Sequence, residues 1–240
     1  MLDVGHVLVG SQNYHLDGPC SDKDYKVLLC PEANDFYFNK RVEKNDVPKG
    51  LDKEHYNPID VRAFDRNLRA GNPNCLEMLW SQEYENLDCE LKLYMDEARD
   101  MFERGYLVMV FQPFFKAVKG LVFNPFSRNG VNRKTASRAM FFYHFIGKVA
   151  SNDFAVKEEF WTSNAARELR FNETIDIPTL EDFQYNFRAV ENPMIEEAEK
   201  TLQKLTLFEY QMFQERASSL QYRMQRFVFD KLEKELNNQY

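Results

Sequence analysis

The chain has 240 residues, of which 44% are hydrophobic and 15% aromatic, a composition that is typical of a globular protein and excludes an intrinsically disordered one. The formal net charge of −7 argues against a general nucleic-acid-binding protein. No uncharged apolar run reaches the roughly 18 residues of a membrane-spanning helix, and no basic region opens the N-terminus. We therefore expect neither a membrane span nor a secretion signal.

The cysteines and histidines argue against disulfide and zinc chemistry. No two cysteines have the C-x-x-C spacing, so we expect reduced thiols in a cytoplasmic protein. The histidines are scattered along the chain, so no zinc site is expected. The cysteines are Cys20, Cys30, Cys75 and Cys89, and the histidines are His6, His15, His55 and His144.

Strand-like runs are confined to the N-terminal half. Val4 to Val9 is a short apolar run that ends at Gly10, and Asp24 to Leu29 is a second one that Pro31 stops. The segment from Ile59 to Leu68 begins as an extended run and continues with helical spacing of its apolar residues. These patterns predict a small sheet.

Helical patterns dominate the rest of the chain. A short helix is expected over Leu76–Trp80, after a turn-forming Gly-Asn-Pro-Asn sequence. The Gly-, Pro- and Asn-containing run 120–132 predicts a loop. Met194 to Leu236 has an apolar stripe of helical period, and Pro193 stands at the favoured first-turn position, so one long amphipathic helix is expected there.

The predicted fold class is α+β. We expect a small mixed β-sheet core over residues 1–105, followed by a mostly helical half over residues 106–240 that ends in the long amphipathic helix. No internal repeat or low-complexity segment is present.

Two carboxylates stand one residue apart at the start of the second predicted strand. On a strand, Asp22 and Asp24 share one face, and two like charges this close repel unless a cation lies between them. Mg²⁺ is commonly held by one or two carboxylates together with substrate phosphates. Gly10 and Ser11 follow the first strand, where a glycine turn offers backbone N–H groups to a phosphate.

Metal-dependent phosphoryl transfer commonly uses a further carboxylate to hold a second metal ion. Asp60 is the best candidate, because in a strand it points away from both of its apolar neighbours. Asp52 and Glu54, in a charged loop, and Asp65, in an apparent helix, are weaker choices.

A basic segment lies inside this acidic protein. Between Gly105 and Asn152 there are seven bases and no acid. Such a segment either binds an anionic ligand or pairs with acids elsewhere in the fold. The bases are Lys116, Lys119, Arg128, Arg133, Lys134, Arg138 and Lys148.

These motifs resemble the DNA polymerase β-like nucleotidyltransferase superfamily, and most closely its bacterial and phage members. The first motif consists of Gly10, Ser11, Tyr14, Leu16, Ser21, Asp22 and Asp24. A second block, IDVRAFDRNLRAGNPNCLEML, matches through Asp60, Arg62, Asn72, Pro73, Glu77 and Leu79. The resemblance covers residues 4–80 well and 134–173 loosely, where Arg138 matches a basic position. His15 departs from it, because glycine is usual at that position.

The resemblance implies a metal-dependent nucleotidyltransferase. A nucleoside triphosphate would lie on the turn at Gly10 and Ser11, with Asp22 and Asp24 binding Mg²⁺ or Mn²⁺ and Asp60 helping to hold a second ion. An acceptor hydroxyl on a protein, an RNA or a small molecule would attack the α-phosphorus and release pyrophosphate. Arg133, Lys134 and Arg138 would contribute phosphate or acceptor contacts.

Other interpretations remain open. Ser21 either contacts substrate or caps a turn, and Arg138 either contacts phosphate or packs its stem among aromatic residues. The whole chain could instead be a non-catalytic nucleotide-binding module of a two-component system. A third alternative is an interaction protein whose C-terminal helix holds a protein partner.

Overall fold

The computed structural model describes residues 1–18 and 21–237 and has the predicted α+β architecture. Cys20 lies outside the described residues. The strands are β1 (Leu2–Val9), β2 (Asp24–Cys30), β3 (Tyr56–Asp60) and β4 (Tyr84–Glu85). The α-helices are α1 (Ala33–Tyr37), α2 (Val61–Arg69), α3 (Pro73–Leu76), α4 (Cys89–Glu103), α5 (Phe111–Asn129), α6 (Arg133–Ala150), α7 (Asn164–Phe171), α8 (Leu180–Lys204) and α9 (Leu207–Asn237).

The sheet is mixed, with strand order β3-β2-β1-β4. β1 pairs antiparallel with β2 and with β4, whereas β2 and β3 run parallel, with Tyr25 opposite Tyr56 and Leu29 opposite Asp60. The central strands are almost entirely buried beyond their first residues, as their runs of apolar residues predict. Because β3 leads directly into α2, its last residue both ends the sheet and starts that helix.

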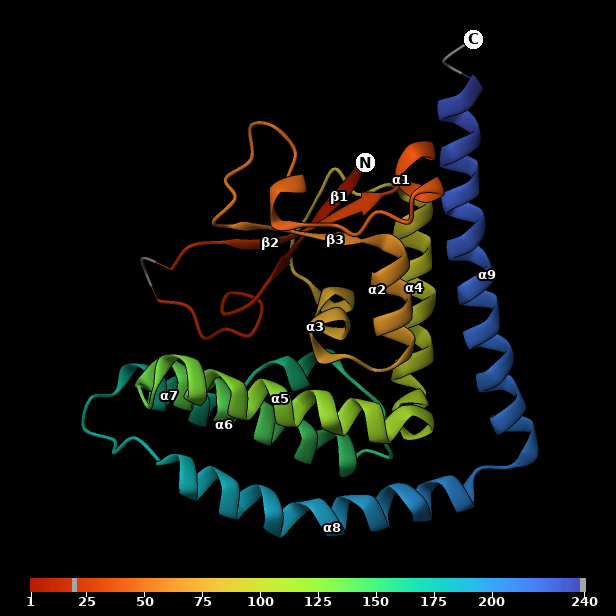
Figure 1. Ribbon diagram of the computed structural model, residues 1–240. Coiled ribbons are helices and arrows are strands. Elements are labelled where there is room, and N and C mark those ends of the chain that lie inside the picture. Colours follow the sequence, from red (N-terminus) through yellow and green to blue (C-terminus); the bar gives the residue numbers. More distant parts are fainter. Residues whose placement is uncertain (19–20, 238–240) are drawn as a thin grey trace.

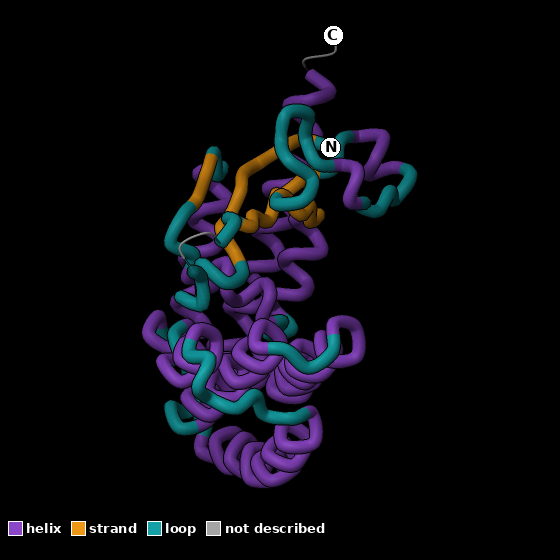
Figure 2. Tube along the Cα trace, turned by 90° about the vertical axis from the view of Figure 1, so that its left-hand side faces the viewer, coloured by secondary structure: helices purple, strands orange, loops and turns teal. Residues whose placement is uncertain are grey.

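The helices enclose the sheet from one end and one side. Figure 1 shows α5, α6 and α7 as a layer below the sheet, with α8 running beneath them. The chain then turns, and α9 passes alongside α4 and α2 to reach α1. The view in Figure 2 agrees that the strands occupy one end of the molecule and that helices fill the other. The last helix therefore packs on the N-terminal half of the chain.

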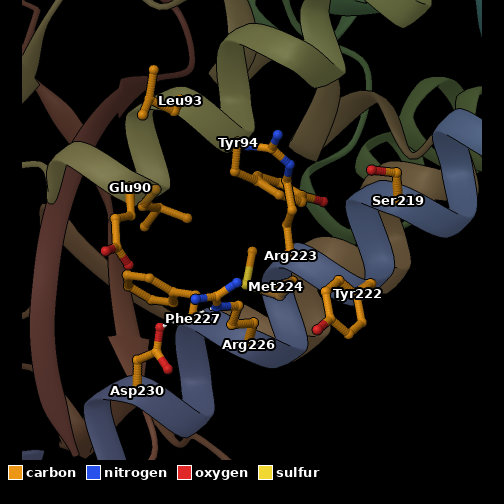
Figure 3. A pocket seen from close by; sticks show the side chains of 11 residues that line it. Glu90, Leu93, Tyr94, Ser219, Tyr222, Arg223, Met224, Arg226, Phe227 and Asp230 are labelled. Atoms are coloured by element: carbon orange, nitrogen blue, oxygen red, sulfur yellow. Dashed lines mark ion pairs between the residues drawn. The ribbon is translucent and has the colours of Figure 1, made fainter.

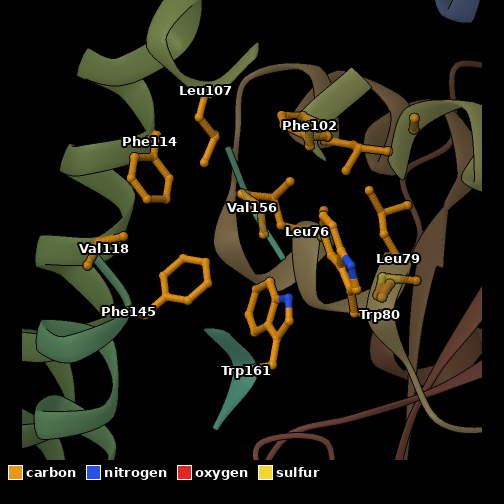
Figure 4. Close-up of a cluster of buried hydrophobic side chains, with 14 of the residues drawn as sticks. Leu76, Leu79, Trp80, Phe102, Leu107, Phe114, Val118, Phe145, Val156 and Trp161 are labelled. Carbon is orange, nitrogen blue, oxygen red and sulfur yellow. The ribbon is translucent and has the colours of Figure 1, made fainter. Parts of the chain in front are cut away.

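One continuous hydrophobic core joins the two halves (Figure 4). Trp80, from the 3₁₀ turn Glu77–Trp80, faces Trp161, whose ring lies 4.5 Å from that of Phe145 on α6. Phe145 also contacts Phe114 on α5. The predicted division at residue 105 remains a prediction, but the apolar packing passes through it without interruption.

The segment 120–132 forms a helix over most of its length, and the prediction of a loop there was wrong. α5 continues through Pro125 to Asn129. Buried aromatic contacts outweigh the low helix propensity of glycine and proline, because Phe123 packs on Phe187 and Phe126 on Phe183, both from α8. Only the three residues 130–132 connect α5 to α6.

The C-terminal segment forms two helices in place of the single predicted one. α8 begins at Leu180, so Pro193 lies inside it, and the chain breaks at Leu205 and Thr206. A capping box starts the new helix α9 at this break. Thr206 Oγ1 accepts a hydrogen bond from the Glu209 amide, and the Glu209 carboxylate accepts one from the Thr206 amide. This T-x-x-E signal was present in the sequence.

One helical stretch, 106–129, passes the length and composition test for a membrane span. Core helices of soluble proteins pass the same test, and α5 buries Phe111, Phe114, Val118 and Val122 in the core shared with α6 and α8. Its apolar character is thus accounted for by packing within the protein.

We predict that Phe145→Ala lowers the free energy of unfolding by about 3–5 kcal/mol, because Phe145 is fully buried among aromatic rings. Denaturant unfolding followed by tryptophan fluorescence and by circular dichroism should give one shared transition, since a single core links both halves. Tyr185→Ala is the matched control: Tyr185 is exposed on α8, and its loss should change stability by less than about 0.5 kcal/mol. Separate transitions for the two signals would contradict a continuous core.

Candidate functional site

The glycine turn and the second predicted carboxylate meet at one end of the sheet. Gly10 directly follows β1 and Asp24 begins β2, and the two strands pair antiparallel with Val9 opposite Asp24. Gly10 has φ +82°, a left-handed conformation that glycine adopts without strain. A Cβ at Gly10 would lie 3.5 Å from a carboxylate oxygen of Asp24, so the Asp24 side chain lies next to the turn.

The residues after Gly10 form a tight helical turn on the surface of α6. The Tyr14 amide donates to the Gly10 carbonyl, and the Leu16 amide donates to the Ser11 carbonyl. The Tyr14 ring is buried and stacks on Phe141, at 4.5 Å between centroids. The helical half thereby fixes the position of the glycine turn.

The Ser21–Asp22 segment lies beside the same turn. The Gln12 side chain donates a 3.0 Å hydrogen bond to the Ser21 carbonyl. The Ser21 hydroxyl accepts a 2.8 Å hydrogen bond from the Gly18 amide, so it caps a local turn, as one of the two interpretations proposed. Asp22 follows in an exposed coil, before β2 begins at Asp24.

Asp60 does not join this group, so its part as the third metal carboxylate stays a prediction that this geometry does not support. The parallel register places Asp60 opposite Leu29, five residues along β2 from Asp24, which is a separation of about 16 Å along the strand. Asp60 is buried and caps α2, accepting a 2.7 Å hydrogen bond from the Arg62 amide and a bidentate contact from the Arg62 guanidinium. Its role is therefore structural.

The weaker alternative Asp65 is also used within the fold. Its carboxylate is buried, accepts two hydrogen bonds from Arg69 and accepts a third from the Tyr94 hydroxyl. These contacts hold α2 against α4 and leave Asp65 far from the glycine turn in the fold.

His55 takes the position beside Asp24 at which a third acid was expected. The Tyr25 amide donates to the His55 carbonyl, which continues the parallel pairing back to the start of β2. The His55 ring lies 3.8 Å from an Asp24 oxygen and 3.6 Å from one of Asp52. Sequence reasoning missed His55 and ranked Asp52 low. If the strand before Asp60 had been extended backwards past Pro58 and paired with the strand that begins at Asp24, His55 and Asp52 would have been found near Asp24.

A buried carboxyl group lies on the inner side of the turn. Glu77 is almost fully buried, and its Oε2 lies 3.5 Å from the Gly10 amide nitrogen, which donates to it. Burial raises the pKa of Glu77 to about 7, although the nearby Tyr14 hydroxyl, the Arg138 guanidinium, the Gly10 amide and Lys26 each favour the charged form. The turn therefore rests on a group that titrates near neutral pH.

Arg138 reaches this buried cluster from α6. It is close enough to Glu77 and Tyr14 to shift the pKa of both groups, and its guanidinium lies over the Phe142 ring at 5.8 Å. Its buried Nε has no hydrogen-bond partner among the described residues. Arg138 packs against an aromatic ring, and it also keeps one N–H donor without a partner among the described residues. The structure is therefore compatible with both interpretations of Arg138.

Other bases of the basic segment are occupied within the fold. Lys119 pairs with Glu191 at 2.9 Å. Arg133 donates to one backbone carbonyl group in α7 and to two in the segment that follows it, and Lys148 donates to two in the segment before α7. Arg133 is therefore a structural residue, whereas the exposed Lys134 has no such contact in the described part of the chain.

The donor chemistry of Asp22 and Asp24 suits a hard divalent cation that also binds phosphates. The Asp24 side chain is 45% exposed, so it is open to ligands. Within residues 1–18 and 21–237, no cluster of three or more acids, histidines or cysteines is arranged to hold a metal ion without substrate. Asp22 and Asp24 would supply at most two carboxylates, so the other ligands of a cation there would have to come from outside the protein.

A groove between α4 and α9, with a volume of about 430 Å³, is lined by Tyr94, Arg223, Phe227 and their neighbours (Figure 3). None of the predicted site residues lines it.

Comparison of the chain with protein-family models, with curated proteins and with solved structures finds no match.

The backbone at His15 explains why glycine suits this position. His15 has φ +54°, and its ring contacts the Gln82 amide at 2.7 Å. Both His15→Gly and His15→Ala lose the ring contact, so their difference isolates the backbone. We predict that the glycine variant is about 1 kcal/mol more stable than the alanine variant in urea unfolding. Equal stability of the two variants would contradict a left-handed turn.

Glu77 should make stability depend on pH. Its folded pKa of about 7 is above its ordinary value of 4.5, so folding takes up a proton between these values. The contribution of Glu77 to stability is therefore complete below about pH 4.5 and lost as pH rises to about 7. Relative to Glu77→Gln, the wild type should lose about 3 kcal/mol over this window. Parallel pH profiles for the two proteins would contradict the assignment.

Proposed function

We propose that this protein binds a nucleoside triphosphate together with Mg²⁺ or Mn²⁺ and transfers its nucleoside monophosphate to a hydroxyl acceptor, releasing pyrophosphate. The observation that carries the proposal is the pairing of Val9 with Asp24, which places the glycine turn that follows Val9 beside a carboxylate. The Gln12–Ser21 hydrogen bond, which draws the Asp22 segment to the same turn, supports it further.

Each residue has a stated part in this proposal. The amides after Gly10 and the Ser11 hydroxyl face the phosphates, and Arg138 supplies positive charge from the helical half. Asp22 and Asp24 hold the cation, which neutralises phosphate charge and polarises the α-phosphorus when bound. Gly10 suits this turn because its φ of +82° would be strained for a residue with a side chain.

The transfer itself exchanges one phosphorus–oxygen bond for another. The acceptor oxygen forms a bond to the α-phosphorus as the bond to the bridging oxygen breaks, and pyrophosphate leaves with that electron pair. The proton of the acceptor hydroxyl passes to solvent water, so the step balances without a further reactant. Positioning and charge neutralisation are the contributions that this chain's residues make to the step.

A second candidate function is nucleotide binding without turnover, as in a module of a two-component system. It is favoured by a specific observation: the side chain beside Asp24 is His55, which Asp52 contacts in turn, whereas Asp60 lies at the other end of β2. A histidine in place of a third carboxylate leaves one negative charge fewer for a second cation. The two candidates share the binding site and differ only in whether transfer follows.

The proposal places the protein in the cytoplasm, where the free thiols of Cys30, Cys75 and Cys89 would stay reduced. A protein, an RNA or a small molecule would be the acceptor. A protein partner held by the C-terminal helix belongs to the interaction-protein alternative, in which the exposed face of α9 is the working surface.

We predict that Asp24→Asn abolishes binding of Mg²⁺ with a triphosphate, whereas Asp60→Asn retains it. Calorimetry with ATP, GTP, CTP and UTP, each with and without Mg²⁺, measures the affinity. Asp60→Asn should instead lower the free energy of unfolding by about 1–3 kcal/mol, because it weakens the buried contact with Arg62. Equal affinities of the wild type and Asp24→Asn would contradict the site.

Transfer is tested with α-labelled triphosphates, Mg²⁺ or Mn²⁺ and whole-cell lysate as the source of acceptors. Label on an acceptor that disappears in Asp24→Asn supports the transferase. Binding with no label transferred from any triphosphate supports the second candidate. Loss of transfer with Asp24→Asn should reach a hundredfold or more, equivalent to about 3 kcal/mol.

A further inference from the structure

The far end of the sheet has a surface that the proposed function does not use. We define the aromatic–arginine face as Phe36, Tyr37, Phe38, Arg41, Arg62 and Arg66. It is formed by α1, the residues that follow it and the first turns of α2. Figure 1 shows α1 beside α9, near the junction of β3 and α2. It lies about 16 Å along β3 from the Asp24 end.

Three aromatic rings on this face are exposed. Phe36, Tyr37 and Phe38 are 40%, 81% and 73% exposed. Tyr37 and Phe38 pack edge to face, and Phe36 contacts Phe229 of α9, which is itself 58% exposed. Consecutive aromatic side chains left in water are costly for a folded protein, and they commonly mark a binding surface.

Guanidinium groups line the hollows next to these rings. A hollow of about 640 Å³ is lined by Lys40, Arg41, Arg62 and Arg66 and by a single acid, Asp60, whose charge Arg62 already balances. A second hollow, of about 420 Å³, lies between α2 and α9 and shares Arg62 and Arg66 with the first.

The aromatic and basic groups are in contact with one another. The Arg62 guanidinium lies over the Phe36 ring, 5.6 Å from its centroid. Arg41 and Arg66 are exposed and have no ion-pair partner among the described residues. In a protein of net charge −7, two arginines without acidic partners beside exposed rings form a local cationic site.

We propose that the aromatic–arginine face binds single-stranded nucleic acid. Arginine forks match phosphate oxygens, and exposed rings offer platforms on which unpaired bases stack. An acidic peptide would use the arginines but leave the rings in water, which is why the combination favours a ligand with both phosphates and flat bases. The inference stands on this face alone and holds whether or not nucleotidyl transfer occurs.

Fluorescence anisotropy of the full chain tests this with a labelled single-stranded RNA of about 12 nucleotides, and with DNA of the same sequence, single-stranded and duplex. The double variant Tyr37→Ala/Phe38→Ala should weaken binding about tenfold or more, because two stacking platforms are lost. Arg41→Ala/Arg66→Ala should lower the slope of log affinity against log salt by about 1.4, the value for two phosphate contacts to a single strand.

The controls use exposed side chains on distant helices. Tyr185→Ala on α8 and Arg167→Ala on α7 remove the same chemical groups and should leave the affinity unchanged. All four altered residues of the test variants are exposed, so the fold should be retained. The proposal is overturned by no binding at low salt, by equal losses in the controls, or by equal affinity for the duplex, for a polyglutamate peptide or for anionic vesicles.

Discussion

The parallel pairing of β2 with β3 decides which side chains meet in this protein. With Tyr25 opposite Tyr56, the pairing brings His55 to Asp24 at one end of the strands and Leu29 to Asp60 at the other. A strand register is strongly specified when its faces are buried, because a slip of one residue would turn every apolar side chain outward. The composition of the candidate site is therefore a consequence of how the core is packed.

Much of the fold was predictable from local sequence patterns. The strands at Val4–Val9 and Asp24–Leu29 were recognised because each is a short apolar run bounded by a glycine or a proline. The loop expected over 120–132 failed because phenylalanine contacts with α8 outweigh the helix-breaking tendency of Gly120 and Pro125. The packing partners on α8 lie about sixty residues further along the chain, so a local sequence pattern cannot predict these contacts.

The candidate site was predictable only where it depends on residues that are close in the sequence. Gly10 and Asp24 flank two adjacent antiparallel strands, so their approach follows from the hairpin-like pairing of β1 with β2. Asp60 was predicted from an acid between two apolar residues, a pattern that here marks a buried helix cap paired with the partly exposed Arg62. His55 was hidden because the segment before Pro58 reads as a charged loop, although its last residues extend the sheet.

The helical half acts on the site through the residues it buries. α6 supplies the aromatic surface under Tyr14 and the guanidinium of Arg138, so the glycine turn is held by contacts formed more than one hundred residues later in the chain. Glu77 adds a titrating group beneath that turn. α9 packs against α2 and α4, so the last helix of the chain is held on the N-terminal half.

The central claim is that a divalent cation and a triphosphate bind at the Gly10–Asp24 end of the sheet, and not at Asp60. The most direct measurement is a crystal structure with Mn²⁺ and a non-hydrolysable triphosphate, in which anomalous scattering locates the manganese. The account predicts a peak beside the carboxylates of Asp22 and Asp24, with phosphates on the turn. A peak beside Asp60, or no bound manganese at saturating triphosphate, would contradict it.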